Sequence, residues 1–494
     1  MKKKAYLNTI TSLVMQITSV ICGFIVPRLM LERYGSEVNG LIQSITQFLG
    51  LITFMELGVG QVIQSALYKP LANGDREQIS CILKSGANYF QKIAYGLLAY
   101  IAILLVLFPA ITDDRFHWGD IAALICAISA GTLAQYYFGL VDKILLSADQ
   151  RGYIQYSAQI VTTLLNTAAV MLMVHAGCSV QLVKAGTAVI FLLNPLAVRW
   201  YIRRNYEIDR KIKYKEEPVS QKWNGIAQHI SAVVLEGTDN IVLTLFATLS
   251  DVSIYSTYFL VISGVRQLYV SLTAGLQSMV GSLWARNEIG RLERLFQRIE
   301  TALHLFVVFV FSCVAVLIVP FIRVYTNGLT DAEYVQPAFA AILTLAYGIR
   351  CLRTPYNMMI LAGGHYKQTQ KCHIAAAVLN IVISVFAVRR WGLIGIALGT
   401  LAAFTYQTLW MVWYNSRALL RLPLRRTMKR FLADAAAATA IVLVLQGLEL
   451  RTVSYWGWFC MAVPAAVIAL VITGIMGVLT NRHEILRLWS CGRR

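Results

Sequence analysis

Two arginines three residues apart, Arg350 and Arg353, lie within a long apolar stretch of the chain. If that stretch is a helix, both guanidinium groups share one of its faces. Arginine binds phosphate oxygens through a planar fork of N–H donors. The pair therefore predicts a receptor for a diphosphate group.

A second set of polar residues shares a helical face by the same rule. Glu236, Asp239 and Asn240 lie within another apolar stretch. Ionisable residues at membrane depth are costly, so they usually face a cavity or a partner. This set predicts a site for a coupling cation, either Na⁺ or H⁺, and no other cofactor is expected.

A structural interpretation of these charges stays open beside the functional one. The interior arginines would then pair with the interior carboxylates and hold that part of the chain together. The arginines concerned are Arg266, Arg350 and Arg353, and the carboxylates are Glu236 and Asp239.

Two further charges stand apart from these sets. Glu56 lies within an apolar stretch with no charged neighbour in sequence, which favours a functional role. Arg28 lies near the outer end of the first apolar stretch. It is also placed to act as an anchor that reaches the outer headgroups.

The composition is that of a membrane protein. The 494 residues are 57% hydrophobic and 14% charged, with a mean hydropathy of +0.60, whereas soluble domains carry about a quarter charged residues. The net charge of +19 lies mostly in short loops, where it sets topology and attracts anionic headgroups. Nucleic acid is not an expected partner. The nine cysteines form no C-x-x-C pair, and no metal site is expected.

Apolar blocks of roughly 20 residues, the length of a membrane-crossing helix, recur along the whole chain. They predict an all-α polytopic membrane protein with about fourteen transmembrane helices. The expected spans are 7–31, 38–68, 86–112, 118–146, 153–175, 180–203, 223–247, 253–283, 302–325, 336–362, 371–388, 392–416, 431–448 and 456–479.

The basic residues predict the orientation. With both termini in the cytoplasm, 33 of the 44 Lys and Arg lie in inner loops and tails, 8 lie in outer loops, and 3 lie inside spans. This bias follows the positive-inside rule. We expect a multi-pass protein of a bacterial cytoplasmic membrane.

The chain is internally duplicated at an offset of about 214 residues. Leu165-Asn166 corresponds to Leu379-Asn380, and Gly186-Thr187 corresponds to Gly399-Thr400. Each repeat has six spans, so both copies enter the membrane from the same side, an architecture found in transporters. The predicted domains are a first lobe (1–205), a basic cytoplasmic linker (206–222), a second lobe (223–416), and two additional spans with a tail (417–494).

The inner loops that follow spans two and eight carry amphipathic patterns. Leu292, Leu295, Phe296 and Ile299 lie on one helical face, with arginines elsewhere. This pattern is typical of a helix that lies on the inner membrane surface.

Several segments resemble the Wzx-type polysaccharide flippases of the multidrug/oligosaccharidyl-lipid/polysaccharide exporter superfamily. The segments are Pro27-Arg28-Leu29, Tyr34-Gly35-Ser36-Glu37-Val38-Asn39-Gly40, Phe54-Met55-Glu56-Leu57-Gly58-Val59-Gly60, Ala66-Leu67-Tyr68-Lys69-Pro70-Leu71 and Gly237-Thr238-Asp239-Asn240-Ile241-Val242-Leu243.

The resemblance implies a lipid-linked oligosaccharide flippase that works by alternating access. The cargo would be an undecaprenyl-diphosphate-linked sugar, and polysaccharide assembly enzymes would be partners. The resemblance also implies a central cationic cavity. The positions that could supply it are Arg28, Arg266, Arg350 and Arg353, with Glu56 as a further candidate substrate contact.

Three alternatives stay open. The two additional spans resemble the fourteen-span branch that includes lipid II flippases. A MATE-type drug/cation antiporter would share the duplicated fold, but a cationic cargo requires an acidic cavity. A membrane enzyme, such as a glycan polymerase or transferase, usually carries a large outer loop, and every outer loop here is short. We therefore do not expect an enzyme.

Overall fold

The computed structural model describes residues 2–56, 59–112, 116–210, 212, 226–420, 423–446 and 454–491. These residues are helical apart from short connections, which confirms the predicted all-α class. Among them, nine helices are long and apolar enough to cross a membrane. The expected count of fourteen spans is not confirmed.

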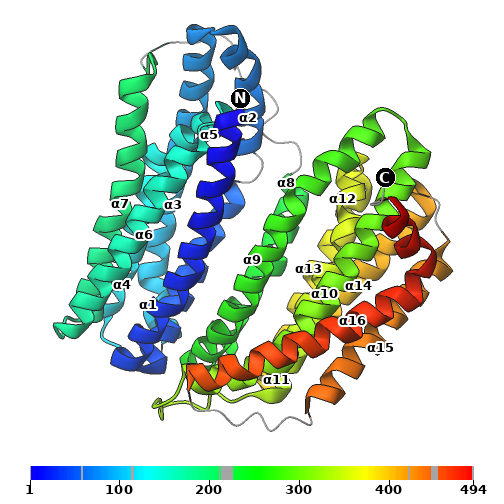
Figure 1. Ribbon diagram of the computed structural model, residues 1–494. Coiled ribbons are helices and arrows are strands. Elements are labelled where there is room, and N and C mark those ends of the chain that lie inside the picture. Colours follow the sequence, from blue (N-terminus) through cyan, green and yellow to red (C-terminus); the bar gives the residue numbers. More distant parts are fainter. Residues whose placement is uncertain are drawn as a thin grey trace. The chain divides into compact units, whose positions relative to one another are not determined.

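The chain forms two compact units that part between Leu245 and Phe246. The domain bounds expected from the sequence stay a prediction. The helices of the first unit (Figure 1) are α1 (Lys2–Gly50), α2 (Val59–Asn73), α3 (Arg76–Ile111), α4 (Trp118–Ala134), α5 (Leu140–Ala148), α6 (Gly152–His175), α7 (Val180–Asn205) and α8 (Ile226–Phe246), the last of which ends one residue beyond the boundary.

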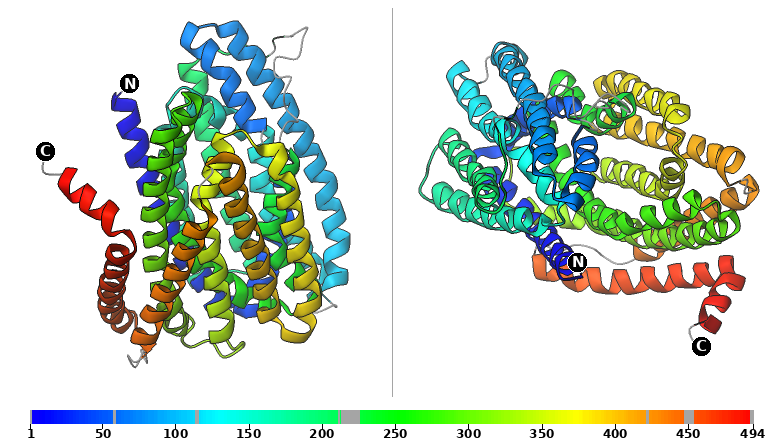
Figure 2. Two further views of the ribbon diagram at one scale, coloured as in Figure 1. Left: turned by 90° about the vertical axis from the view of Figure 1, so that its right-hand side faces the viewer. Right: turned by 90° about the horizontal axis from the view of Figure 1, so that it is seen from above.

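The second unit contains the remaining helices. They are α9 (Leu249–Ala285), α10 (Ile289–Tyr325), α11 (Pro337–Leu352), α12 (Thr354–Ala362), α13 (Tyr366–Trp391), α14 (Leu393–Tyr414), α15 (Leu424–Gln446) and α16 (Tyr455–Cys491). Within this unit, α15 and α16 pack along α10 (Figures 1 and 2).

The first two expected spans are joined at Gly35. This residue has φ 82° and ψ 175°, which breaks α1 into two helical segments. Glycine has no Cβ and adopts positive φ without strain. The second expected span is itself interrupted, because a 3₁₀ turn at Leu51–Met55 follows α1 before α2 begins at Val59.

Equivalent glycines allow equivalent helix pairs to pack closely in the two units. A Cβ at Gly186 of α7 would lie 2.8 Å from Met173 of α6. A Cβ at Gly399 of α14 would overlap Ser384 of α13. Because these glycines correspond in the duplicated sequence, the close crossings support the internal repeat.

The outer surface is apolar, as expected for contact with lipid. Val106, Leu172 and Phe386 are 78%, 72% and 77% exposed. Large apolar side chains exposed in this number would associate in water, whereas hydrocarbon solvates them.

The amphipathic faces after spans two and eight do not form separate surface helices. Leu292, Phe296 and Ile299 are buried in the first turns of α10, and Ile79 and Ile82 are buried in α3. The prediction of a helix lying on the membrane surface was therefore wrong. The periodicity was real, but the apolar face packs against protein.

Candidate functional site

The expected tenth span is interrupted at Arg353, the single residue between α11 and α12, although the backbone there stays helical (φ −69°, ψ −21°). In a continuous helix the carbonyl of Cys351 would accept from the backbone N–H of residue 355. That residue is Pro355, which has no N–H. The hydroxyl of Tyr269 in α9 donates to the Cys351 carbonyl at 2.9 Å instead. The break is thus encoded by a proline and stabilised by a tyrosine from another helix.

Three of the predicted substrate contacts lie in the neighbourhood of Cys351, next to this interruption. The guanidinium groups of Arg266, Arg350 and Arg353 all lie close enough to the Cys351 thiol to act on it electrostatically. Arg266 comes from α9, whereas Arg350 lies in the last turn of α11 and Arg353 lies between α11 and α12. The structure therefore brings together three cations that lie up to 87 positions apart in sequence.

Aromatic side chains position two of these arginines. The guanidinium carbons of Arg350 and Arg353 lie 5.3 Å and 5.9 Å from the ring centroid of Phe404 in α14. Arg350 also lies 5.8 Å from the Tyr347 ring. A guanidinium contacts an aromatic ring with its plane and keeps its N–H donors at its edge. The shared contact with Phe404 agrees with the spacing that predicted one common helical face.

The first unit is distorted at the equivalent place. Residues 135–139 correspond to residues 349–353 at the offset set by Leu165 and Leu379. They form a π-helical turn, Gln135–Gly139, between α4 and α5. Such turns widen a helix and are frequent at functional sites.

Glu56, which has no charged neighbour in sequence, lies near residues of this π-helical turn in the fold. Tyr136 and Lys143 are both close enough to act on its carboxylate. Lys143 follows Glu56 by 87 positions, so the contact is invisible to a search for neighbours along the chain. Glu56 therefore belongs to a small polar cluster of the first unit.

A cavity of about 370 Å³ lies beside this cluster. Its polar lining residues are Thr46, Thr132, Gln135, Lys143, Gln159, Lys184, Thr187 and Asn194. Lys184, which falls within the expected span 180–203, lies in the first turns of α7 and lines this cavity. Two lysines thus line one cavity in the first unit.

The other predicted site residues lie elsewhere in the first unit. The Nε atom of Arg28 lies 3.8 Å from Glu32, one helical turn away. Asp239 in α8 is 2% exposed, and Asn240 is half-buried. The side chain of Glu236 lies outside the described residues. The roles of all these residues in substrate or ion binding stay predictions.

The sequence interpretation missed a buried charged network in the second unit. Arg430 of α15 donates to Glu300 of α10 at 2.7 Å, and Tyr356 of α12 donates to the same carboxylate at 2.6 Å. One turn along, His304 lies 2.6 Å from Asp434. These pairs link α15 to α10.

Among the described residues, no group of three or more His, Cys, Asp or Glu side chains is arranged to hold a metal ion.

Comparison with known proteins identifies the fold but no sequence family. No protein-family model and no curated protein matches the chain. The structure is similar to that of the lipid II flippase MurJ in an inward closed conformation, with a TM-score of 0.70 and 15% identity. The match covers 97% of this chain and 100% of that one.

Multidrug transporters share the architecture less completely. An inward-facing MATE family transporter of the MOP superfamily matches with a TM-score of 0.61 and 13% identity, over 83% of this chain and 98% of its own. The MATE multidrug transporter DinF-BH matches with a TM-score of 0.57 and 13% identity, over 86% of this chain and 97% of its own. The chain thus has the polytopic helical fold of these flippases and transporters.

Proposed function

We propose that this chain is a flippase of the MOP superfamily. It would move an undecaprenyl-diphosphate-linked oligosaccharide from the inner to the outer leaflet of a bacterial cytoplasmic membrane, for assembly of a surface polysaccharide. Transport would proceed by alternating access of the two lobes. The proposal includes polysaccharide assembly enzymes as partners and cytoplasmic locations for both termini.

One observation carries the proposal: Arg350 and Arg353 share the Phe404 ring, and both lie, with Arg266, near Cys351. A diphosphate carries its charge on several oxygens, and arginine forks match that geometry. A cationic drug would be repelled by the same groups, which argues against a drug/cation antiporter.

Lipid II is the second candidate cargo. The match to the MurJ structure extends over 97% of this chain, whereas the matches to the two MATE structures cover 83% and 86%. Both candidate lipids carry a diphosphate, so the arginine cluster fits either one. The coupling ion would bind at Glu236, Asp239 and Asn240.

The test is replacement of Arg350 and Arg353 by alanine in a strain that depends on this chain. Surface polysaccharide should be lost while the membrane level of the protein stays normal. The matched control replaces Arg389 and Arg390, two exposed arginines at the end of α13, and should export normally. Normal glycan export by the Arg350/Arg353 double variant would contradict the proposal.

A further inference from the structure

The first residues of the predicted basic linker (206–222) are bound to the first unit. Residues 206–210 are attached at four points. Tyr206 donates to Asp149 at 2.6 Å, Glu207 pairs with Arg76, the backbone N–H of Asp209 donates to Ser80 at 3.2 Å, and Arg210 donates to Asp142 at 2.9 Å. We call residues 206–210 the strap.

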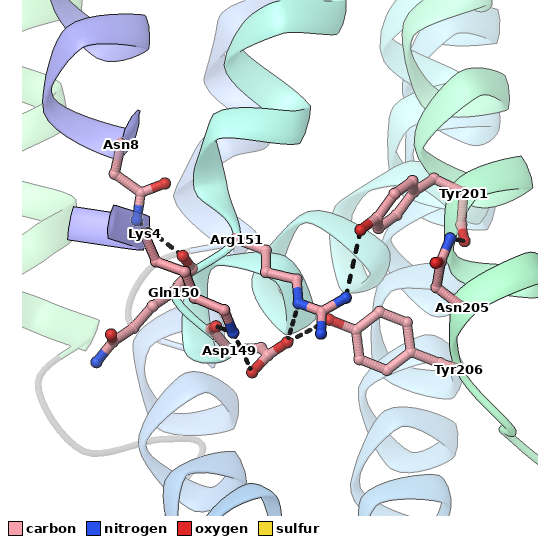
Figure 3. Close-up of polar contacts among 8 residues, drawn as sticks. All are labelled: Lys4, Asn8, Asp149, Gln150, Arg151, Tyr201, Asn205 and Tyr206. Atoms are coloured by element: carbon pink, nitrogen blue, oxygen red, sulfur yellow. Dashed lines mark hydrogen bonds and ion pairs between the residues drawn. The ribbon is translucent and has the colours of Figure 1, made fainter. Parts of the chain in front are cut away.

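Asp149 fixes the start of the strap (Figure 3). Its carboxylate accepts a hydrogen bond from the Tyr206 hydroxyl and pairs with the Nε of Arg151 at 2.7 Å and the ammonium of Lys4 at 3.4 Å. Arg151 also lies over the Tyr206 ring, with 5.3 Å between the guanidinium carbon and the ring centroid. Three separate parts of the chain thus converge on one carboxylate, which holds the first residue of the strap in place.

The strap borders a cavity of about 290 Å³, which lies within the first unit. Its wall combines cations with apolar and aromatic side chains. Lys84 of α3, Arg199 of α7 and Arg210 of the strap supply the positive charge. Leu83, Phe138 and Ile208 supply part of the apolar surface. The π-helical turn presents Tyr136, Tyr137 and Phe138 to the cavity in succession.

The cavity has more cations than anions. Asp142 is the one carboxylate among its described lining residues, and it receives both of its hydrogen bonds, at 2.9 and 3.2 Å, from Arg210. The Nε atom of Arg199 is buried and has no hydrogen-bond partner within the described part of the chain. Its guanidinium carbon lies 5.7 Å from the Phe138 ring centroid. A buried donor without a partner is costly, and an anionic ligand would remove that cost.

We propose that this cavity binds the phosphate group of an anionic membrane lipid. On the expected topology it lies at the cytoplasmic ends of the first unit's helices, where the leaflet is rich in anionic lipid. Its mixed apolar and basic wall suits a headgroup better than a free ion. The proposal does not rest on the transport function and concerns a site separate from the arginine cluster of the second unit.

Calorimetric titration of the purified full chain in neutral detergent tests this site. The titrants are dioctanoyl phosphatidylglycerol, dioctanoyl phosphatidylcholine and inorganic phosphate. Phosphatidylglycerol should bind at least about tenfold more tightly than phosphatidylcholine, whose choline cation the cavity repels. If inorganic phosphate binds more tightly than phosphatidylglycerol, and Arg199→Gln weakens that binding, the site is supported but its ligand is soluble phosphate.

Two substitutions should move the affinity in opposite directions. Arg199→Gln should weaken phosphatidylglycerol binding about tenfold, the loss expected for one charge-assisted hydrogen bond. Asp142→Asn should strengthen it, because Arg210 is released from its carboxylate partner. Arg204→Gln removes an exposed charge from the same helix and should have no effect. Equal affinity for both lipids, or unchanged binding in the Arg199 and Asp142 variants, would overturn the proposal.

Discussion

The hydroxyl of Tyr269 donates to the carbonyl of Cys351 at the point where Pro355 removes the helical donor. Arg350 and Arg353 flank Cys351 in sequence, and Arg266 lies close enough to act electrostatically on the same thiol. The segment that carries two of these arginines therefore lacks one regular helical hydrogen bond, and a neighbouring helix supplies the missing donor.

Replacing Tyr269 by phenylalanine should weaken this arrangement. The Cys351 carbonyl would stay buried without its donor, which costs about 1–3 kcal/mol. We expect a lower thermal unfolding temperature in detergent and reduced glycan export. Tyr406→Phe, at an exposed tyrosine of α14, is the control. If the Tyr269 variant is as stable and active as the wild type, the hydrogen bond from Tyr269 is not needed to stabilise this part of the helix.

Gly395 should tolerate no side chain. A Cβ at this position of α14 would overlap the backbone carbonyl of Ala387 in α13. Backbone has little room to shift, so Gly395→Ala should abolish the monodisperse peak in size-exclusion chromatography. A Cβ at Gly474 in α16 would meet no atom within 4 Å. Gly474→Ala should be neutral or stabilise by up to about 1 kcal/mol, and equal behaviour of the two variants would refute the close crossing.

The Glu300–Arg430 pair should dominate the docking of α15. Both side chains are at least nine-tenths buried, and removal of one partner of a buried pair costs about 3–5 kcal/mol. Arg430→Leu should therefore lower the unfolding temperature strongly, while replacement of both residues by leucine should cost less. Arg291→Leu breaks the exposed pair with Glu288 and should change stability by no more than about 1 kcal/mol. If the losses of stability in the single Arg430→Leu and Glu300→Leu variants add up to the loss in the double variant, the two residues are not energetically coupled.

Tyr206 should stabilise the strap through its hydroxyl. Burial, with the hydrogen bond to Asp149, raises the pKa of Tyr206, so the group stays a donor at neutral pH. Tyr206→Phe keeps the ring beneath Arg151 but loses this bond, at a cost of about 1.5–3 kcal/mol for a charged acceptor. Limited proteolysis should then cut the strap faster. Tyr68→Phe, at an exposed tyrosine of α2, should leave the cleavage rate unchanged.

Composition and apolar periodicity predicted the helical membrane class, because they depend only on the lipid solvent. The shared face of Arg350 and Arg353 also followed from helical spacing. The interruption at Arg353 had a signal in Pro355, since a proline inside a span removes one backbone donor. The sequence interpretation nevertheless treated 336–362 as one helix.

Contacts between distant segments could not be predicted from local pattern. Asp142 and Arg210 are 68 positions apart, and Glu56 comes close enough to Lys143 to interact electrostatically only in the folded chain. Similarly, the apolar face of Leu292 and Phe296 correctly indicated a helix, but periodicity does not distinguish a lipid surface from a protein partner. Tertiary packing decides these cases.

The most direct test of the central claim is a flipping assay in proteoliposomes with a fluorescent prenyl-diphosphate-linked sugar. The wild-type chain should move the lipid between leaflets well above the rate of empty vesicles. Arg350→Gln/Arg353→Gln should reduce that rate at least about tenfold, equivalent to about 1.4 kcal/mol, and Arg389→Gln/Arg390→Gln should retain it. Wild-type rates in the Arg350/Arg353 variant, or movement of a cationic dye and not the anionic lipid, would contradict that claim.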